Sequence, residues 1–287
     1  MSIPAGRFAP SPTGPLHLGS LLAATASYLD ARHRGERWYV RIDDLDVPRN
    51  VPGAEQAILT SLEAHGLNWD GPVLRQSERL ESYEAALVSL ETRHLTFNCT
   101  CARKQLKGLG PYPGTCRDAA HGPDDAAVRV RVTDQPVRFD DLVMGDVEEN
   151  LARTTGDFII RRRDGLIAYQ LATAVDDGRP EITRVVRGVD LLDNTARQCH
   201  LMQLLSLSPP RYAHVPMILN RDGQKLSKQT HAPALDDSTP AANLRQILPM
   251  LGLNPPTALG SADELLEWAS VEFDLAPLKG GPDSYRH

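Results

Sequence analysis

Residues 7–20 read R-F-A-P-S-P-T-G-P-L-H-L-G-S, and this stretch decides the fold of the chain. The spacing predicts a short strand over 7–9 and a helix over 16–33 that ends at Gly35. The prolines in 10–15 cannot continue a regular element and therefore predict a turn. In such a unit the free N–H groups and the positive end of the helix dipole face the turn. That arrangement favours a bound phosphate.

Two positions in this unit suit a nucleotide. His17 at the helix start can donate to a phosphate oxygen, and Gly19 lets a flat base or a ribose approach the backbone closely. The pattern G-x-x-x-x-G-K-[ST] does not occur in the sequence, which excludes a P-loop. A lone histidine at a helix start is more often a capping or surface residue, so a second signal is needed.

The second signal is K-L-S-K at 225–228, far along the chain from the first. Alone, such a run is usually a solvated loop. Paired with 7–20 in this order, it predicts an ATP site that works by positioning and fixed positive charge. A strand predicted over 38–42 delivers the acidic run 43–46 at its carboxyl end, which is the edge where open α/β sheets bind ligands.

The rest of the chain predicts a sheet that is interrupted and then resumed. Helical spacing over 54–65 and 82–93 gives way, from about 95 to 180, to short strands and turns, which indicates an inserted region. The insertion includes the predicted strands 127–132 and 158–163, and helical and strand patterns return at 194–205 and 215–219.

Composition narrows the class of protein. The 287 residues are 41% hydrophobic and 24% charged, which suffices for a buried core in two or three domains. No apolar leader and no run of about 18 uncharged apolar residues occurs, so we expect a cytoplasmic protein without membrane association. The net charge of −6 argues against nonspecific coating of nucleic acid, whereas a local basic face such as 161–163 could still contact RNA.

Three cysteines, Cys99, Cys101 and Cys116, cluster in the inserted region and carry a separate signal. Disulfides are unfavoured in the cytoplasm, so the cluster predicts either a metal site or three unligated thiols. Three thiolates leave one position of a tetrahedral zinc site open. The residues alone leave the fourth ligand open among Tyr112, Asp118 and His121. A further cysteine, Cys199, stands apart on a predicted helix, and we expect it to be buried.

The two signatures together resemble those of class I aminoacyl-tRNA synthetases, and 7–20 resembles the glutamyl branch of that class. The resemblance covers nearly the whole chain and is weakest after about residue 240. It implies an α/β fold without an anticodon-binding domain. The implied parts are a Rossmann-type nucleotide-binding catalytic domain over 1–80 and 175–228, an inserted α+β, acceptor-binding-like subdomain over 81–174 with a zinc element at 99–116, and a small helical, stem-contact-like tail over 229–287.

The resemblance also implies roles in catalysis. In this family the histidine and the second lysine of the signatures stabilise the α-phosphate while a carboxylate attacks it and pyrophosphate leaves. The catalytic residues implied here are His17 and Lys228, with Lys225 in support. ATP would enter with Mg²⁺. The implied ATP-binding residues are Pro10, His17, Gly19, Ser20 and Lys228.

The sequences around Tyr169, Asp176-Asp177 and Arg187 resemble the stretches that line the glutamate pocket of the glutamyl branch. Glutamate has two carboxylates and one ammonium, so a selective pocket needs two arginines and one acid. Asp43 departs from the family, which usually has glutamate at this position; the side chain that carries the carboxylate is therefore one methylene shorter. The implied glutamate-binding residues are Arg7, Ala9, Ser11, Asp43, Tyr169 and Arg187; which arginine binds which carboxylate stays open.

For the metal, C-x-C followed by Y-x-x-x-C matches the zinc element of a short relative of the glutamyl enzymes. The resemblance therefore implies one structural Zn²⁺ per chain, bound by Cys99, Cys101, Tyr112 and Cys116. A closed coordination sphere of this kind leaves no room for substrate.

The length of the tail separates members of the family. After Lys228 the chain offers a predicted helix over 240–251 with Thr239 as N-cap, and another from Ala262 with a capping box between Ser261 and Glu264. Glutamyl-tRNA synthetases continue much further, into a domain that reads the anticodon. The resemblance is therefore to a truncated relative.

Such a relative activates glutamate with ATP in the absence of tRNA and then transfers it to queuosine in the anticodon stem-loop of tRNA(Asp). The diol of queuosine imitates the 2′,3′-diol of a terminal ribose. We expect a monomer with this activity. Two alternatives remain: a truncated synthetase that charges a tRNA 3′ end, and an inactive tRNA-binding paralogue, against which the complete set His17, Lys225 and Lys228 speaks.

Overall fold

The strand, turn and helix unit at the start of the chain forms as predicted in the computed structural model, which describes residues 3–219, 233–278 and 285–286. Strand β1 (Ala5–Phe8) leads through the loop to helix α1 (Leu18–His33). The helix begins later than expected because His17 is its N-cap, with extended backbone and a side chain that accepts from the N–H of Ser20. It ends near Gly35, whose φ of 64° is the left-handed conformation that favours glycine.

Two sets of strands join into the central sheet. In the first, β1 pairs in parallel with β2, and β2 with β3. In the second, β9 and β6 pair in parallel with β10, and β7 is antiparallel to β6. A bridge between Ala5 and Ile182 brings β1 beside β9 and so connects the two sets. The strands are β2 (Arg37–Ile42), β3 (Leu74–Arg75), β6 (Val137–Asp141), β7 (Gly145–Glu149), β9 (Arg184–Gly188) and β10 (Arg211–Val215).

The junction of β1 with β9 positions the site. From β1 the sheet extends to β2 on one side, and from β9 it extends to β10 on the other, so the chain order reverses at this point. In open α/β sheets the crevice at such a switch, at the carboxyl ends of the strands, is where ligands bind. The predicted α/β architecture is confirmed, with mixed rather than purely parallel pairing.

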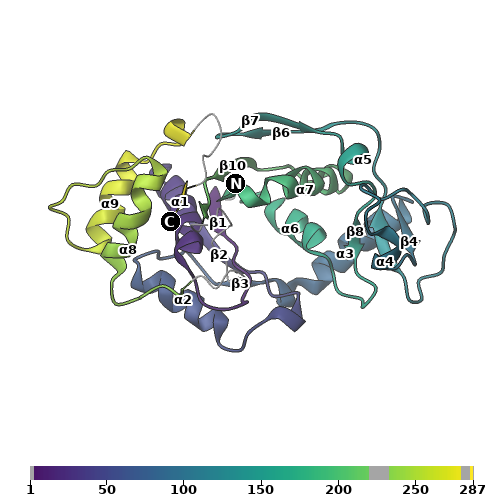
Figure 1. Cartoon of the computed structure of the whole chain (residues 1–287), viewed down its shortest axis with the longest axis horizontal. Helices are drawn as coiled ribbons and strands as arrows, with labels where there is room; N and C mark the ends of the chain where they lie inside the picture. Colours follow the sequence, from purple (N-terminus) through teal and green to yellow (C-terminus); the bar gives the residue numbers. More distant parts are fainter. Residues whose placement is uncertain (1–2, 220–232, 279–284, 287) are drawn as a thin grey trace.

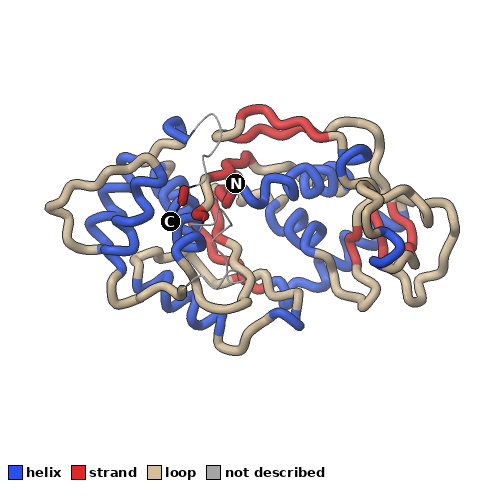
Figure 2. The backbone as a smooth tube through the Cα atoms, viewed as in Figure 1, coloured by secondary structure: helices blue, strands red, loops and turns tan. Residues whose placement is uncertain are grey.

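The inserted region contains a separate antiparallel sheet. Strand β5 (Ala127–Val130) lies between β4 (Thr96–Cys99) and β8 (Ile159–Arg161). The short helices α4 (Arg103–Leu106) and α5 (Leu151–Thr154) accompany it. Figure 2 shows these strands at one end of the molecule, apart from those of the centre.

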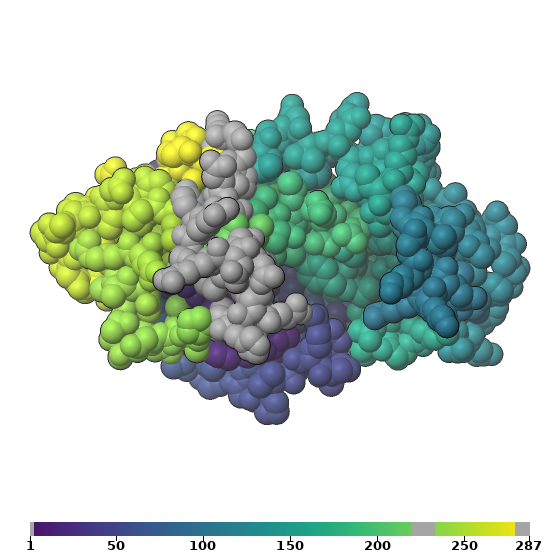
Figure 3. Space-filling view, viewed as in Figure 1, coloured from purple at the N-terminus to yellow at the C-terminus, as the bar shows by residue number. Residues whose placement is uncertain are grey.

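Helices cover the sheet and form the opposite end. They are α2 (Ala54–Ala64), α3 (Leu80–Thr92), α6 (Tyr169–Asp177), α7 (Leu192–Leu204), α8 (Pro240–Ile247) and α9 (Ala262–Glu272). Figure 1 places α8 and α9 at one end of the elongated molecule and the sheet of the inserted region at the other, and Figure 3 shows the same two ends in space-filling form.

Apolar side chains gather in two clusters. The first joins α1 and β2 to the tail, where Leu244 and Leu265 are fully buried. The second joins α3, α6 and α7 to the inserted region, with Leu171 and Ile160 at its centre. The tail thus shares one hydrophobic core with the first part of the chain, although the sequence predicts it as a separate unit. Cys199 is buried in the second cluster, as expected.

Proline explains two differences from the expected elements. The helix predicted over 240–251 is α8 followed by a 3₁₀ turn, Leu248–Leu251, because Pro249 lacks the N–H that an α-helix needs there. The strand predicted over 215–219 breaks at Pro216 into β10 and β11 (Ile218–Leu219), which pairs with β12 (Tyr285–Arg286). Further 3₁₀ turns are Val47–Arg49, Gln76–Arg79, Val189–Leu191 and Ala276–Leu278.

The two predicted N-caps of the tail differ. Ser261 and Glu264 form the expected capping box at the start of α9. Thr239 occupies the N-cap position of α8, but its hydroxyl donates to the carbonyl of Asp236 instead of capping the helix. No helix within the described ranges is long and apolar enough to cross a membrane.

Candidate functional site

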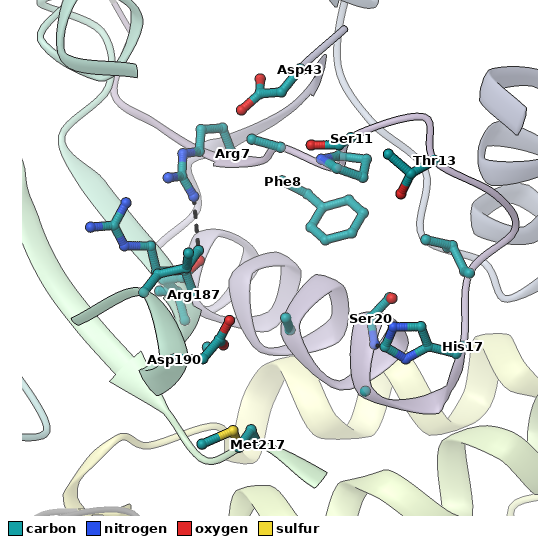
Figure 4. Close-up of a pocket in the computed structure, with 18 of the residues that line it drawn as sticks. Arg7, Phe8, Ser11, Thr13, His17, Ser20, Asp43, Arg187, Asp190 and Met217 are labelled. Carbon is teal, nitrogen blue, oxygen red and sulfur yellow. Dashed lines mark hydrogen bonds between the residues drawn. The ribbon is translucent and has the colours of Figure 1, made fainter. Parts of the chain in front are cut away.

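A pocket of about 440 Å³ opens at the carboxyl ends of the central strands. Its walls come from the loop after β1, the ends of β2 and β9, and the residues after β10. Figure 4 shows Arg7 and Arg187 at one end of the pocket and His17 and Ser20 at the other. The structure therefore brings together residues from both sides of the inserted region, at the point where the strand order reverses.

One end of the pocket is formed by the N-terminus of α1. The Nδ1 atom of His17 accepts from the N–H of Ser20 at 3.2 Å, so a neutral ring carries its proton on Nε2. An Nε2–H donor beside the positive end of a helix dipole suits a phosphate oxygen. Pro10 and Gly19 line the same pocket. Lys225 and Lys228 lie outside the described residues.

At the other end, two arginines share a buried carboxylate. Arg7 donates to both oxygens of Asp177, from Nε at 3.1 Å and from Nη2 at 2.9 Å. Arg41 donates to the same carboxylate from Nη1 at 2.5 Å. Although burial opposes the shift, these two guanidiniums hold the pKa of Asp177 well below its usual range. Arg7 therefore reaches the pocket with most of its charge already compensated.

Arg41 is a pocket residue that the sequence analysis did not find. It is the last but one residue of β2, and an arginine between Val40 and Ile42 at the carboxyl end of a predicted strand is the signal that could have identified it. Its guanidinium also donates to both oxygens of Asp43, at 2.6 and 3.2 Å. Burial raises the pKa of Asp43 to about 6, against the opposing effect of Arg41. Asp43 lines the pocket as predicted.

Arg187 has a different environment from Arg7. It is 4% exposed, and its Nε donates to Nε2 of His214 at 3.1 Å, while Nη2 donates to the hydroxyl of Thr195 at 2.7 Å. Its Nη1 is buried and has no hydrogen-bond partner among the residues that the structure describes. Among the described residues Arg187 forms no direct ion pair, although its charge acts on Asp177 and helps to lower the pKa of that carboxyl.

The remaining predicted glutamate-pocket residues also lie at this pocket. Ala9 and Ser11 line it from the loop after β1. Tyr169, the first residue of α6, is 39% exposed and sits on the pocket wall. The acid beside Asp177 is used differently: Asp176 is buried and accepts from the side chains of Gln76, Arg79 and Tyr83.

The three clustered cysteines converge on one point. Their sulfur atoms lie within 4.8 Å of one another, and Cys101 and Cys116 are 3.4 Å apart. Thiolates around one zinc ion would be about 3.8 Å apart, since each Zn–S bond is about 2.3 Å. The hydroxyl of Tyr112 lies 3.5 Å from the sulfur of Cys99 and 4.0 Å from that of Cys101. The three sulfurs and the hydroxyl therefore lie close enough together to contact one metal ion.

The two rival ligands do not join this group. Asp118 is 92% exposed and pairs with Arg131, and His121 lies beside the hydroxyl of Thr100. In the basic run that the sequence offered as an RNA contact, Arg162 pairs with two acids, Asp46 and Asp164. The charge of that run is thus partly compensated within the protein.

Backbone packing sets the position of Tyr112. The residue forms a bridge with Gly156, whose φ is 70°. A Cβ at position 156 would lie 2.5 Å from the carbonyl oxygen of Tyr112 and 2.6 Å from its nitrogen. Glycine is therefore required there for a close approach of two backbones.

Comparison with known proteins agrees with this geometry. A family model described as "tRNA synthetases class I (E and Q), catalytic domain" matches residues 5–110 and 114–250. The "Glutamyl-Q tRNA(Asp) synthetase" of Pseudomonas aeruginosa is 54% identical over 272 residues, which cover 94% of this chain and 93% of the relative. The protein of the same name from Thiobacillus denitrificans is also 54% identical, over 280 residues, with 94% and 93% covered.

A solved structure shows the same fold. The glutamate tRNA ligase from Elizabethkingia meningosepticum, crystallised in complex with its amino acid, superposes with a TM-score of 0.81 at 27% identity. The match covers 99% of this chain and 67% of that one.

The shared carboxylate yields a stability prediction. Asp177→Asn would leave Arg7 and Arg41 buried without their common partner, and loss of one member of a buried ion pair costs roughly 3–5 kcal/mol. We expect urea unfolding at pH 7 to show a loss of that size. The control is Glu148→Gln, which breaks the exposed pair with Arg138 and should cost less than about 1 kcal/mol. Equal losses in both variants would contradict the prediction.

Proposed function

Because this chain belongs to the class I tRNA synthetases of the glutamyl and glutaminyl type, we propose that it activates glutamate with ATP and transfers it to queuosine in the anticodon of tRNA(Asp). The enzyme is an ATP-dependent ligase. Relatives that carry the corresponding name align over 94% of this chain and 93% of their own sequences. The observation that carries the proposal is the buried Nη1 of Arg187 at the pocket, which has no hydrogen-bond partner in the described ranges and can donate to a substrate carboxylate.

The two ends of the pocket have different roles in the activation of glutamate. Glutamate lies at the arginine end, so that its α-carboxylate faces the phosphates of ATP, whose Mg²⁺ enters with the nucleotide. A carboxylate oxygen attacks the α-phosphorus, the bond to the bridging oxygen breaks, and pyrophosphate leaves. The Nε2–H of His17 and the N-terminus of α1 stabilise the charge that develops on the α-phosphate oxygens. We assign Lys228, with Lys225 in support, to the same charge.

The second step, transfer of glutamate to the tRNA, takes place in the same pocket. A hydroxyl of the queuosine diol attacks the carbonyl carbon of glutamyl-adenylate, AMP leaves, and an ester forms. The hydroxyl proton is lost in this step. Because the cyclopentene diol and a terminal ribose diol present adjacent hydroxyls in a similar way, a site of this family can accept either.

Recognition of glutamate rests on charge pairing. Arg187 offers one carboxylate a guanidinium that has no direct carboxylate partner among the described residues, and Arg7 contributes its remaining N–H groups beside it. Asp43 attracts the ammonium, with Arg41 holding its carboxylate in place. Tyr169 closes the wall and can donate its hydroxyl. A zwitterion with a second carboxylate satisfies this set of charges.

For the cysteine cluster we propose a structural Zn²⁺ bound by Cys99, Cys101, Tyr112 and Cys116. The convergence of three sulfurs and one hydroxyl supports this assignment. When bound, the ion would crosslink β4 to the following loop and supply no chemistry to the pocket, because four protein ligands complete its coordination.

The close contact at Gly156 tests the metal assignment. Gly156→Ala would displace Tyr112, and loss of ligand position of this kind typically weakens metal binding roughly 10- to 100-fold. We expect that loss when zinc is measured by competition with a chelator of known affinity. The matched control is Gly165→Ala: Gly165 also has a positive φ, 85°, but open space around a Cβ. Equal zinc affinity in both variants would remove Tyr112 from the ligand set.

The raised pKa of Asp43 predicts a pH dependence of glutamate binding. Below a pKa of about 6 the carboxyl is protonated in the folded protein and no longer attracts the ammonium. The KM for glutamate should therefore rise as the pH falls, by roughly tenfold between pH 7 and pH 5. ATP–pyrophosphate exchange measures it, with the KM for ATP as an internal control. Asp43→Asn should have a high KM at pH 7 and no such rise; a parallel rise in this variant would assign the titration to another group.

Labelled glutamate tests the function itself. With ATP, the enzyme should label tRNA(Asp) that contains queuosine and not tRNA(Asp) that lacks it, and the label should remain on the anticodon stem-loop after nuclease trimming. Lys228→Ala should abolish ATP–pyrophosphate exchange. Label at the 3′ end of both tRNA forms would identify a charging enzyme instead, and no label with either would indicate an inactive tRNA-binding paralogue.

A further inference from the structure

Three polar side chains form a row beneath the pocket, one on each of three neighbouring strands. In the parallel ladder of β9 and β10, Arg187 stands opposite His214. In the ladder of β6 and β10, Asp141 stands opposite Tyr212, two residues before His214. Residues at matching or alternate positions of paired strands share one face of a sheet. The register of the sheet therefore places these groups side by side.

The row is buried and connected. The side chains of His214 and Asp141 are 0% exposed, and their Nδ1 and Oδ2 atoms lie 2.5 Å apart. His214 Nε2 lies 3.1 Å from Nε of Arg187 and 3.1 Å from the hydroxyl of Thr195. A buried polar network of this kind is costly unless its donors and acceptors match.

The hydrogen bonds determine where the proton of His214 resides. A guanidinium can only donate, so Nε2 of His214 must accept from Nε of Arg187 and carries a lone pair. The ring proton is then on Nδ1, which donates to the carboxylate of Asp141. Burial lowers the pKa of His214, which agrees with a neutral ring.

Asp141 is itself held in one orientation. Its Oδ1 accepts from the backbone N–H groups of Val143 at 3.0 Å and Met144 at 2.8 Å. Oδ2 is left to face the ring of His214. The turn between β6 and β7 thus determines which oxygen meets the imidazole.

We propose that Asp141 and His214 are positioning residues for the substrate carboxylate: Asp141 sets the tautomer of His214, and His214 with Thr195 holds Arg187 so that its third nitrogen faces the pocket. This inference rests on the proposed function, because the carboxylate is taken to be that of glutamate. Neither residue was identified from the sequence.

A neutral acceptor has an advantage over a carboxylate in this position. Arg7 is held by Asp177, which compensates its charge. Arg187 is held by an uncharged imidazole and a hydroxyl, which orient the guanidinium without a carboxylate bonded directly to it in the described part of the chain. The hydrogen bonds from Arg187 to a substrate carboxylate are then charge-assisted, and such bonds are stronger than those between neutral groups.

The variant Asp141→Asn tests the tautomer. The amide oxygen would keep the N–H groups of Val143 and Met144, so the amide NH₂ would face Nδ1 of His214 and require a lone pair there. The ring proton would move to Nε2, where it opposes the Nε–H of Arg187. We expect the KM for glutamate in ATP–pyrophosphate exchange to rise roughly tenfold or more, with kcat and the KM for ATP within about twofold of wild type.

The control variant is Asp140→Asn, which removes the neighbouring charge from an exposed side chain that faces Arg211 and should leave the KM for glutamate unchanged. His214→Gln provides a rescue, because the glutamine amide oxygen can occupy the position of Nε2 and accept from Arg187 without help from Asp141. In that background Asp141→Asn should change the KM for glutamate less than about threefold. Such non-additivity is the mark of residues that act through one another.

Nitrogen-15 NMR of the histidine rings gives a readout independent of activity. The His214 signals, identified by their loss in His214→Gln, should report the Nδ1–H tautomer in wild type and the Nε2–H tautomer in Asp141→Asn. If Asp141→Asn does not fold, Thr195→Val removes another acceptor of Arg187 and should raise the KM for glutamate alone.

The Nε2–H tautomer in wild type would overturn the proposal, as would an unchanged KM for glutamate in both Asp141→Asn and Thr195→Val. Wild-type protein that shows the expected tautomer but no glutamate-dependent exchange would overturn the proposed function instead. The two failures are therefore distinguishable.

Discussion

The carboxylate of Asp177 is the group on which the pocket depends. It comes from the last residue of α6 and accepts from Arg7 on β1 and Arg41 on β2, so one side chain fixes the carboxyl ends of two strands. Arg41 in turn holds Asp43. Without this anion Arg7 would lose its carboxylate partner and Arg41 would keep only the other acids beside it, Asp43 and Asp176, so the two buried cations would repel each other more strongly. The shape of the amino-acid end follows from this arrangement.

The three arginines of the pocket differ in what they offer a ligand. Arg7 and Arg41 are compensated by carboxylates, whereas Arg187 is held by an imidazole and a hydroxyl. A pocket with three free guanidiniums would bind any small anion and would be expensive to bury. Because carboxylates compensate the charges of Arg7 and Arg41, the strongest attraction for an anionic ligand is at Arg187. The number of arginines in a sequence does not show which of them are compensated in this way.

Local features were predictable and long-range ones were not. The strand, turn and helix around His17 depend on neighbouring residues, and the cysteines lie close enough in sequence to predict their cluster. The pairing of Arg7 with Asp177 joins residues 170 positions apart, and the role of His214 depends on the register of β10 against β9. The hydrophobic periodicity of the sequence predicts neither this ion pair nor this strand register. The strand broken by Pro216 is the opposite case, because the proline that interrupts it is visible in the local sequence.

The bridge between Ala5 and Ile182 has a consequence for the order of assembly. Strands β1 and β2, which form one side of the pocket, leave the ribosome early. Strand β9, which lies beside β1 in the sheet, follows only after the whole inserted region has been made. Until then Arg7 and Arg41 have no shared anion, and the edge of β1 is unpaired. Contacts so distant in sequence slow folding, because the loop must close first. Newly made chains therefore pass through a stage in which this strand edge is unpaired, and unpaired strand edges are prone to aggregation.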